Sequence, residues 1–479
     1  MSDPEVLIIG GGISGLSVGW WLARRGIHCE IWEEKNRPGG KIRSRLANGY
    51  LTEQAASLVT NFRPEITCLI QESGLEDKKL PRPRKAEARR YLLHEGKLQA
   101  LPSRPLAMLL SPLWSWRGKL RLLAEPWIPR NGSGHESVAQ FISRRLGREI
   151  LEKAMEPFIG GTLAADATLA DARTTLPRLT ALEERYGSIT LGVLAHRLMR
   201  RREAATDESF SFQGGLSTLI DGLVATLPER VLTGRKAVEL NRDGRFWRVN
   251  GTSATGEVTV RVRHVVLSTP AAITAALLTP LDQELGSTIS TIQYAPLAVL
   301  HLGLSREQVS HPLDGSGFLT PASAGISFNG NLWMSSLFPE RAPPGKVLLS
   351  SYVGGYRAPY MVDWSEERVA AAVCRDLGPI LGLKGEPEWV HVDRHPQALP
   401  LYYGNHRQRL VTIEERLRRL AGLHLAANYQ GGVSVRDRIL CGAQIAGAIA
   451  GQLDRKWPIG RCHPYAGLQP YEDGTLSTR

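Results

Sequence analysis

Residues 6–15 read Val6-Leu7-Ile8-Ile9-Gly10-Gly11-Gly12-Ile13-Ser14-Gly15. Four consecutive apolar residues followed directly by glycines are typical of a buried parallel strand that ends in a tight turn. Residues 16–25 then have helical spacing, Gly26 is placed to end that helix, and residues 29–32 predict a second strand. The segment therefore predicts a strand–turn–helix–strand unit at the start of the chain.

The glycine turn has the spacing of a dinucleotide-binding loop. Gly10 permits the tight turn, Gly12 lets the backbone approach a pyrophosphate, and Gly15 lets the helix pack closely on the strand. Glu33 follows the second strand at the distance from which a carboxylate accepts a hydrogen bond from a ribose hydroxyl. The residues expected to contact the dinucleotide are Gly10, Gly11, Gly12, Ile13, Ser14, Gly15 and Glu33.

Two further segments favour FAD over NAD as the dinucleotide. A second glycine pair, Gly39-Gly40, comes shortly after Glu33, where another loop could approach the cofactor. Near the end of the chain, residues 423–427 predict a strand, 428–432 a turn and 433–453 a helix. The positive end of such a helix can face the flavin pyrimidine ring and stabilise the anionic reduced flavin.

The composition is that of a folded globular protein with more than one core. The chain has 479 residues, 42% of them hydrophobic, and a net charge of +12. A basic excess suits an anionic membrane surface or an acidic substrate. We expect no nucleic-acid partner.

Cysteines, histidines and the amino terminus argue against several other classes of protein. The five cysteines are scattered without a CxxC pair, which favours free thiols in a reduced compartment. His391 and His395 lie in a stretch expected to be extended and followed by Pro396, so we expect no metal site. We also expect no signal peptide and no membrane span. The predicted location is cytoplasmic, with peripheral membrane contact.

Longer segments across the chain share a more specific pattern. They include Gly39-Gly40-Lys41-Ile42-Arg43-Ser44, Tyr91-Leu92-Leu93-His94-Glu95-Gly96-Lys97-Leu98, Glu125-Pro126, Glu156-Pro157-Phe158, Tyr186-Gly187-Ser188, Gln213-Gly214-Gly215-Leu216, His311-Pro312-Leu313-Asp314-Gly315 and Gly431-Gly432-Val433-Ser434-Val435-Arg436-Asp437. By these segments the chain resembles the oxygen-dependent protoporphyrinogen oxidases, within the wider amine-oxidase-like FAD flavoproteins, over nearly its whole length.

The resemblance implies an α/β fold with an added helical part, of the p-hydroxybenzoate-hydroxylase and amine-oxidase-like class. It comprises a Rossmann-like FAD-binding lobe of discontinuous segments, a mixed-sheet substrate lobe and a helical membrane-binding lobe. The expected boundaries are 1–84 for the first FAD-binding part and the start of the substrate lobe, 85–205 for the helical lobe, 206–280 for the second FAD-binding part, 281–410 for the substrate sheet, and 411–479 for the third FAD-binding part and the tail.

Residues 101–130 have the composition of an interfacial membrane helix. Tryptophans and leucines alternate there with basic side chains, which suits the surface of an anionic bilayer. The alternative is an amphipathic helix packed inside the protein. The tryptophans are Trp114, Trp116 and Trp127, and the basic residues include Arg117, Lys119 and Arg121. A following helix, with Ser137 and Gln140 in capping-box spacing, is expected to face a core.

The resemblance also implies the reaction. The substrate is a porphyrinogen, FAD is bound non-covalently and takes hydride from a methylene bridge, and O2 reoxidises the flavin to give hydrogen peroxide. Because the cofactor carries this chemistry, we assign no acid–base catalytic residue. The expected function is the oxidation of protoporphyrinogen IX to protoporphyrin IX in haem biosynthesis. A homodimer is left open.

Three other functions remain open from the sequence. The first is oxidation of coproporphyrinogen III, whose four propionates in place of two call for more cationic groups in the pocket. The second is a flavin dehydrogenase or desaturase acting on an apolar specialised metabolite. The third is a non-enzymatic flavin-binding scaffold at a membrane, against which the retention of both flavin segments argues.

The resemblance assigns individual residues to the site. Gly330 and Leu332 are expected to line the substrate ring near the flavin, and Ala237 to meet the adenine. The residues expected near the rest of the cofactor are Gly39, Gly40, Lys41, Arg43, Asn428, Val433, Ser434 and Val435.

One segment departs from the family pattern. Family members often have a Gly-Pro pair after Glu53, and many have a nearby arginine that can pair with a substrate propionate. Here the stretch reads Gln54-Ala55-Ala56-Ser57-Leu58. We still expect Ala55, Ala56, Ser57 and Leu58 at the cofactor, and Arg63 could replace the missing arginine. These departures favour the second alternative, a flavin dehydrogenase or desaturase acting on an apolar metabolite.

Overall fold

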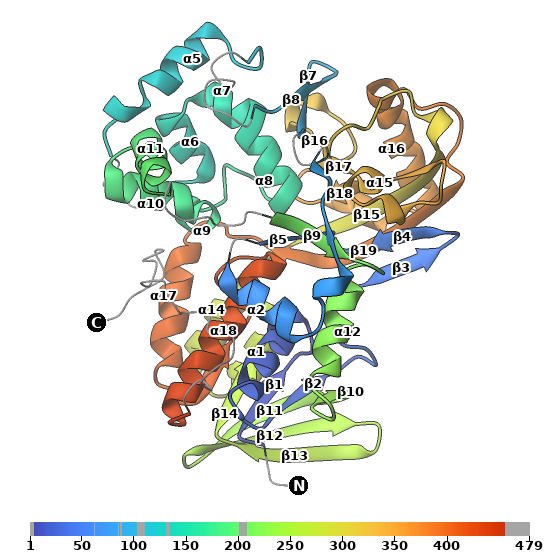
Figure 1. Ribbon diagram of the computed structural model, residues 1–479. Coiled ribbons are helices and arrows are strands. Elements are labelled where there is room, and N and C mark those ends of the chain that lie inside the picture. The colour runs from blue at the N-terminus through green and yellow to red at the C-terminus, as the bar shows by residue number, and fades with distance from the viewer. Residues whose placement is uncertain are drawn as a thin grey trace.

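The computed structural model describes residues 4–61, 63–84, 86, 89–102, 111–130, 135–200 and 208–455. Its first sheet, the parallel sheet, has the strand order β10-β2-β1-β14-β20, and every adjacent pair is parallel. The strands are β1 (Val6–Ile9), β2 (Cys29–Glu33), β10 (Val231–Thr233), β14 (His264–Leu267) and β20 (Leu423–Leu425). The sheet, in the lower half of Figure 1, therefore draws strands from the beginning, middle and end of the chain.

The parallel sheet is buried on both faces, which explains the unbroken apolar run of β1. Val6 and Ile8 enter one core with α1 (Ile13–Ala23) and α18 (Val435–Gln452). Leu7 and Ile9 enter a second core, which α13 (Ala271–Leu278) shares. The strand–turn–helix–strand unit predicted at the amino terminus is confirmed.

The helix predicted near the carboxyl end is confirmed as α18, and it packs very closely on α1. A Cβ placed on Gly442 would lie 2.4 Å from Ser17 Oγ. Ser17 Oγ in turn donates a hydrogen bond to the Ile439 carbonyl at 3.2 Å. Only small residues permit this approach, so the two ends of the nucleotide unit are held together by glycine and serine.

The second large sheet is mixed and has seven strands in the order β19-β15-β18-β17-β16-β7-β8. They are β7 (Tyr91–His94), β8 (Lys97–Ala100), β15 (Tyr294–Ser305), β16 (Gly317–Leu319), β17 (Gly330–Trp333), β18 (Lys346–Gly354) and β19 (Trp389–Pro400). β16 pairs with β7 in parallel, and the other pairs are antiparallel. His391 and His395 lie in β19, which confirms that this stretch is extended.

The seven-stranded sheet has one apolar face and one mixed face. Helix α16 (Glu366–Leu381) packs its Val369 and Val373 on the apolar face. The other face meets the hairpin of β3 (Ser44–Ala47) and β4 (Tyr50–Glu53), because a Cβ on Gly303 would lie 2.5 Å from the Tyr50 ring. This mixed face carries the residues that matter for the site.

Helices form the upper left of Figure 1. They include α5 (Trp116–Leu123), α6 (Val138–Arg145), α8 (Glu156–Leu163), α10 (Pro177–Tyr186) and α11 (Ile189–Arg200). Their core holds a fully buried ion pair between Arg145 and Glu125. Glu125 also accepts from the Ile189 and Thr190 backbone N–H groups at 3.0 Å each, so it caps α11. The Glu125-Pro126 segment is therefore explained by a structural role.

The capping box predicted at Ser137 is confirmed, and the helix it begins, α6, faces a core with Val138, Phe141 and Ile142. The interfacial helix expected within residues 101–130 is only partly correct. Within the described part of that stretch, the helix runs from Trp116 to Leu123. Residues 103–110 lie outside the described residues.

The prediction that Trp114 lies on an exposed, membrane-facing surface is wrong. It packs in the core of the helical part and is only 2% exposed, whereas Trp116 is 66% and Trp127 81% exposed. Trp114 precedes the helix, so it does not share the helical register of Trp116. No helix in the described ranges is long and apolar enough to cross a membrane.

Candidate functional site

The first glycine loop has the geometry expected of a dinucleotide turn. Gly10 has a φ of +108°, and its N–H donates to the Trp32 carbonyl at 2.8 Å. A Cβ on Gly15 would lie 2.0 Å from the Gly10 carbonyl oxygen, so no side chain fits there. Gly12 is the residue before α1, and Ile13 and Ser14 begin that helix. The loop therefore presents backbone N–H groups at a helix start.

Glu33 is held against this loop. Its Oε2 accepts from the Gly11 N–H at 2.7 Å, and its Oε1 accepts from the Lys35 N–H at 2.9 Å. The side chain is 9% exposed. Ala237, in β11 (Lys236–Asp243), is buried and shares the core that contains Trp32, the neighbour of Glu33. Glu33 and Ala237 therefore lie near the same end of the parallel sheet.

The second glycine pair lies directly on the first loop. The Gly39 N–H donates to the Gly11 carbonyl at 2.7 Å, and Gly12 and Gly39 form a parallel bridge. A Cβ on Gly12 would meet only Gly40 Cα, at 4.0 Å. Bare backbone therefore faces open space where a pyrophosphate would have to approach. This arrangement fits the FAD that the sequence predicts.

Two tyrosines, the half-buried Tyr294 and the buried Tyr402, fix the position of Asn428. Tyr294 donates from its hydroxyl to Asn428 Oδ1, and Tyr402 donates to the Asn428 carbonyl, each at 3.0 Å. Burial raises the pKa of Tyr294 to about 12, so its hydroxyl stays protonated as a donor. Neither tyrosine was predicted, because each lies far in sequence from the turn that it holds.

The residues after this turn begin α18. Val433 is half-buried, Ser434 is the N-cap residue and Val435 is the first helical residue. Ser434 Oγ accepts from the Asp437 N–H at 3.2 Å, which completes a capping box. The hydroxyl of Ser434 is therefore engaged within the helix end, and the backbone of this end is the part open to a cofactor.

Lys41 joins the second glycine pair to the seven-stranded sheet. Its Nζ donates to the Ala398 carbonyl at 2.5 Å and to the Gln397 carbonyl, and lies 5.6 Å from the centre of the Tyr294 ring. Burial lowers the pKa of Lys41 to about 8. Arg43, by contrast, is exposed, and its carbonyl accepts from the Gln54 N–H at 2.9 Å.

The segment Gln54–Leu58 meets the residues expected at the substrate. Ser57 Oγ lies 3.2 Å from the Tyr352 hydroxyl, and Tyr352 pairs in register with Gly330. Leu58 and Leu332 pack against one apolar cluster, and Ala56 packs against the core of α1. The structure therefore brings together Ser57, Leu58, Gly330 and Leu332, while Ala55 is half-buried between them.

A buried ion pair lies next to this segment. Arg341 Nη2 is 3.0 Å from Glu53 Oε1, and both side chains are 1% exposed. Glu53 also accepts from the Leu216 N–H at 2.9 Å and from Ser44 Oγ at 2.7 Å. Burial raises the pKa of Glu53, and Arg341 opposes that shift. These contacts connect β4 to Leu216 and Arg341, which are more than a hundred positions away, so no local sequence pattern predicts them.

Arg63 lies at the start of α2 (Pro64–Glu72), where its N–H donates to Asn61 Oδ1 at 3.0 Å.

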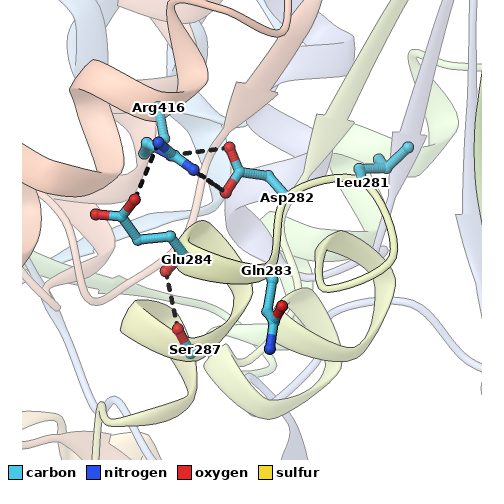
Figure 2. Close-up of a pocket in the computed structure, with 6 residues that line it drawn as sticks. All are labelled: Leu281, Asp282, Gln283, Glu284, Ser287 and Arg416. Atoms are coloured by element: carbon cyan, nitrogen blue, oxygen red, sulfur yellow. Dashed lines mark hydrogen bonds and ion pairs between the residues drawn. The ribbon is translucent and has the colours of Figure 1, made fainter.

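Figure 2 shows a separate surface pocket, in which Arg416 pairs with Asp282 and Glu284, each at 2.9 Å. Its single cation is shared between two carboxylates, and its lining contains no residue of the glycine loops. Within the described chain, no group of three or more His, Cys, Asp or Glu side chains is placed to hold a metal ion.

Known proteins agree with this geometry. The chain matches the family described as flavin containing amine oxidoreductase over residues 13–449. It is 29% identical to the mitochondrial protoporphyrinogen oxidase of Nicotiana tabacum, across 95% of this chain and 96% of that protein. It is 25% identical to the coproporphyrinogen III oxidase of Bacillus subtilis, across 92% and 97%.

The fold is also found among solved structures. An Exiguobacterium sp. 255-15 protein, provisionally described as a protoporphyrinogen oxidase, superimposes with a TM-score of 0.77 at 24% identity, over 94% of this chain and 100% of that one. The two facing glycine loops, the match over most of the chain and these relatives agree with one another. The chain therefore belongs to the flavin-containing amine oxidoreductase family, in which it is an FAD-dependent oxidoreductase similar to the protoporphyrinogen and coproporphyrinogen III oxidases.

Proposed function

We propose that this flavoenzyme oxidises protoporphyrinogen IX to protoporphyrin IX with oxygen as the electron acceptor. The observation that carries the proposal is that Leu332 and Leu58 pack against one apolar cluster, where the seven-stranded sheet meets the segment expected beside the flavin. A reduced tetrapyrrole is a large, mostly apolar ring that needs such a wall. The similarity to the tobacco enzyme over nearly the whole of both chains supports the same substrate.

Different residues would bind different parts of FAD. Gly12 and Gly40 would hold the pyrophosphate, Glu33 the ribose, and Asn428 with the start of α18 the flavin end. Bound FAD supplies the hydride acceptor for a methylene bridge of the macrocycle. Leu58 and Leu332 orient the ring and exclude water. No side chain is assigned a proton-transfer role.

Coproporphyrinogen III is the second candidate substrate, favoured by the similarity to the Bacillus enzyme. Its four propionates would require more cationic groups at the pocket. Arg341, which lies close to this region, is 1% exposed, and its Nη2 is paired with Glu53, so burial keeps its charge from a propionate at the surface of the pocket. This pairing favours protoporphyrinogen IX. A polyene or other apolar metabolite is the third candidate, favoured by the loss of the Gly-Pro pair at Ala55-Ala56.

Steady-state oxidation separates the candidates. We expect purified protein with bound FAD to consume oxygen and form fluorescent porphyrin from protoporphyrinogen IX with a kcat/KM at least about tenfold above that for coproporphyrinogen III. The opposite preference would establish the second candidate. Absence of porphyrin from both substrates, with FAD bound, would leave only the apolar metabolites.

We also propose that the helical part, from α5 to α11, binds the surface of an anionic membrane peripherally. Trp116, Leu120 and Leu123 recur at helical spacing on α5 and are all more than half exposed, and Trp127 follows the helix. Arg117 is exposed beside them. An apolar stripe next to basic residues is the arrangement that binds the interface of an anionic bilayer.

Vesicle binding tests this second proposal. Trp116→Ser with Trp127→Ser should weaken binding to phosphatidylserine-containing vesicles by about tenfold or more, and added salt should weaken it further. Tyr360→Ser is the matched control, because Tyr360 is an aromatic residue, 60% exposed, on another part of the protein. Equal binding of the double variant and the control would contradict the proposal.

A further inference from the structure

The segment Gln54–Leu58 has no regular secondary structure of its own. It follows β4, and its residues are assigned neither to a helix nor to a strand. The family's Gly-Pro pair would restrict this backbone through the proline ring, whereas Ala55-Ala56 does not. Contacts from elsewhere in the molecule must therefore set its position.

Gln54 makes two hydrogen bonds with β19, one through its side chain and one through its backbone carbonyl. Its side-chain Nε2 donates to Asp393 Oδ1 at 2.9 Å. Its carbonyl accepts from His395 Nε2 at 2.8 Å. Asp393 and His395 are two residues apart on one strand, so they present both groups from the same face of the sheet. Three residues later, Ser57 Oγ lies 3.2 Å from the hydroxyl of Tyr352, which is in β18.

Asp393 is itself fixed by a buried polar cluster. It is 5% exposed and lies 3.5 Å from His301 Nε2 and 3.3 Å from His391 Nε2. Burial raises the pKa of Asp393, but the neighbouring His301 and His391 and the hydrogen bond from Gln54 outweigh burial and hold it at about 2. His301 Nδ1 in turn lies 2.8 Å from Ser350 Oγ. The carboxylate is therefore an immobile anion, and hydrogen bonds to anions are stronger than those to neutral acceptors.

We propose that Asp393 is a positioning residue that holds Gln54, and through it the Gln54–Leu58 segment, in place for the flavin and the substrate. The inference rests on the proposed function, since that function puts this segment beside both ligands. Asp393 touches neither ligand. It fixes a segment that has no helix or strand of its own through a contact over 339 positions in sequence.

Gln54→Met tests the proposal, because it keeps the length of the side chain and removes the hydrogen bond. In the FAD-bound protein we expect the FAD dissociation constant to rise about tenfold, the visible circular-dichroism band of the flavin to shift, and KM for protoporphyrinogen IX to rise more than kcat falls. Gln308→Met is the matched control. Gln308 is also half-buried and donates through Nε2, at 2.8 Å to the Glu386 carbonyl, at the far end of the same lobe. It should leave all three readouts within about twofold.

A second variant changes the acceptor side of the same hydrogen bond. Asp393→Asn retains an acceptor oxygen without the charge, so its effect should be smaller, about threefold. In the double variant with Gln54→Met, the flavin readouts should equal those of Gln54→Met alone, because both changes act on one contact. Additive effects, or a wild-type FAD constant and flavin band in Gln54→Met, would overturn the assignment. If wild-type protein binds FAD but oxidises no porphyrinogen, the proposed function fails, while the FAD constant and the flavin band still decide the role of Asp393.

Discussion

The parallel sheet and the mixed face of the seven-stranded sheet place their functional groups in opposite ways. In the parallel sheet the functional residues lie within a few dozen positions of one another: Gly10, Gly15 and Glu33. Close approach of the backbone and a backbone hydrogen bond set their positions. On the mixed face, Gln54 depends on Asp393, and Glu53 depends on Arg341, across hundreds of positions. The glycine loops that would hold the pyrophosphate and ribose are therefore built by local geometry, and the substrate end by long-range polar contacts between buried side chains.

The largest expected effect breaks the long-range side of this comparison. Arg341→Met leaves Glu53 buried without its cation, since both side chains are 1% exposed. Removing one member of such a pair costs about 3 to 5 kcal/mol in the free energy of unfolding. Denaturant unfolding with saturating FAD measures the loss. The double variant Glu53→Gln with Arg341→Met should recover part of it, and a single variant as stable as wild type would show that the pair contributes little.

A smaller effect is expected from the local side. Gly12→Ala puts a methyl group where only Gly40 Cα lies within reach, at 4.0 Å. The apoprotein should therefore keep its thermal stability, while the FAD dissociation constant rises at least about tenfold, because the pyrophosphate loses its approach. Fluorescence titration of FAD measures the change. Gly378→Ala, in an open position on α16, is the control. Normal FAD affinity in Gly12→Ala would mean that the pyrophosphate does not pass between the two glycine loops.

The smallest effect comes from a pair of histidines on neighbouring strands of the parallel sheet. His264 Nδ1 lies 3.2 Å from His424 Nε2, and burial, with the charge of His264, lowers the pKa of His424 to about 4. The unfolded chain takes up this proton near pH 6.5, before the folded protein does. Stability is therefore present at neutral pH and falls by about 1 to 2 kcal/mol as the pH drops from about 6.5 to about 5. His424→Gln should flatten this part of the stability–pH curve, and an unchanged slope would place its origin elsewhere.

The sequence predicted the parallel sheet well because its signals are short-range. The apolar run of β1, the glycine spacing, Gly39-Gly40 and the small residues of α18 each report their own surroundings. The prediction for the buried Trp114 was wrong because Trp114 and Trp116 lie in the same stretch of tryptophans, leucines and basic residues. Only the start of α5 after Ser115 distinguishes their surroundings. Tyr294, Arg341 and Asp393 could not be found, since hydrogen bonds across hundreds of residues leave no periodicity. The roles assigned to Gly330, Leu332 and Arg63 stay predictions.

Rapid anaerobic mixing of the FAD-bound protein with protoporphyrinogen IX tests the central claim most directly. The absorbance of the oxidised flavin should bleach within a single turnover as porphyrin appears, and it should return when oxygen is admitted. A flavin that an artificial reductant bleaches but protoporphyrinogen IX leaves oxidised would contradict the account.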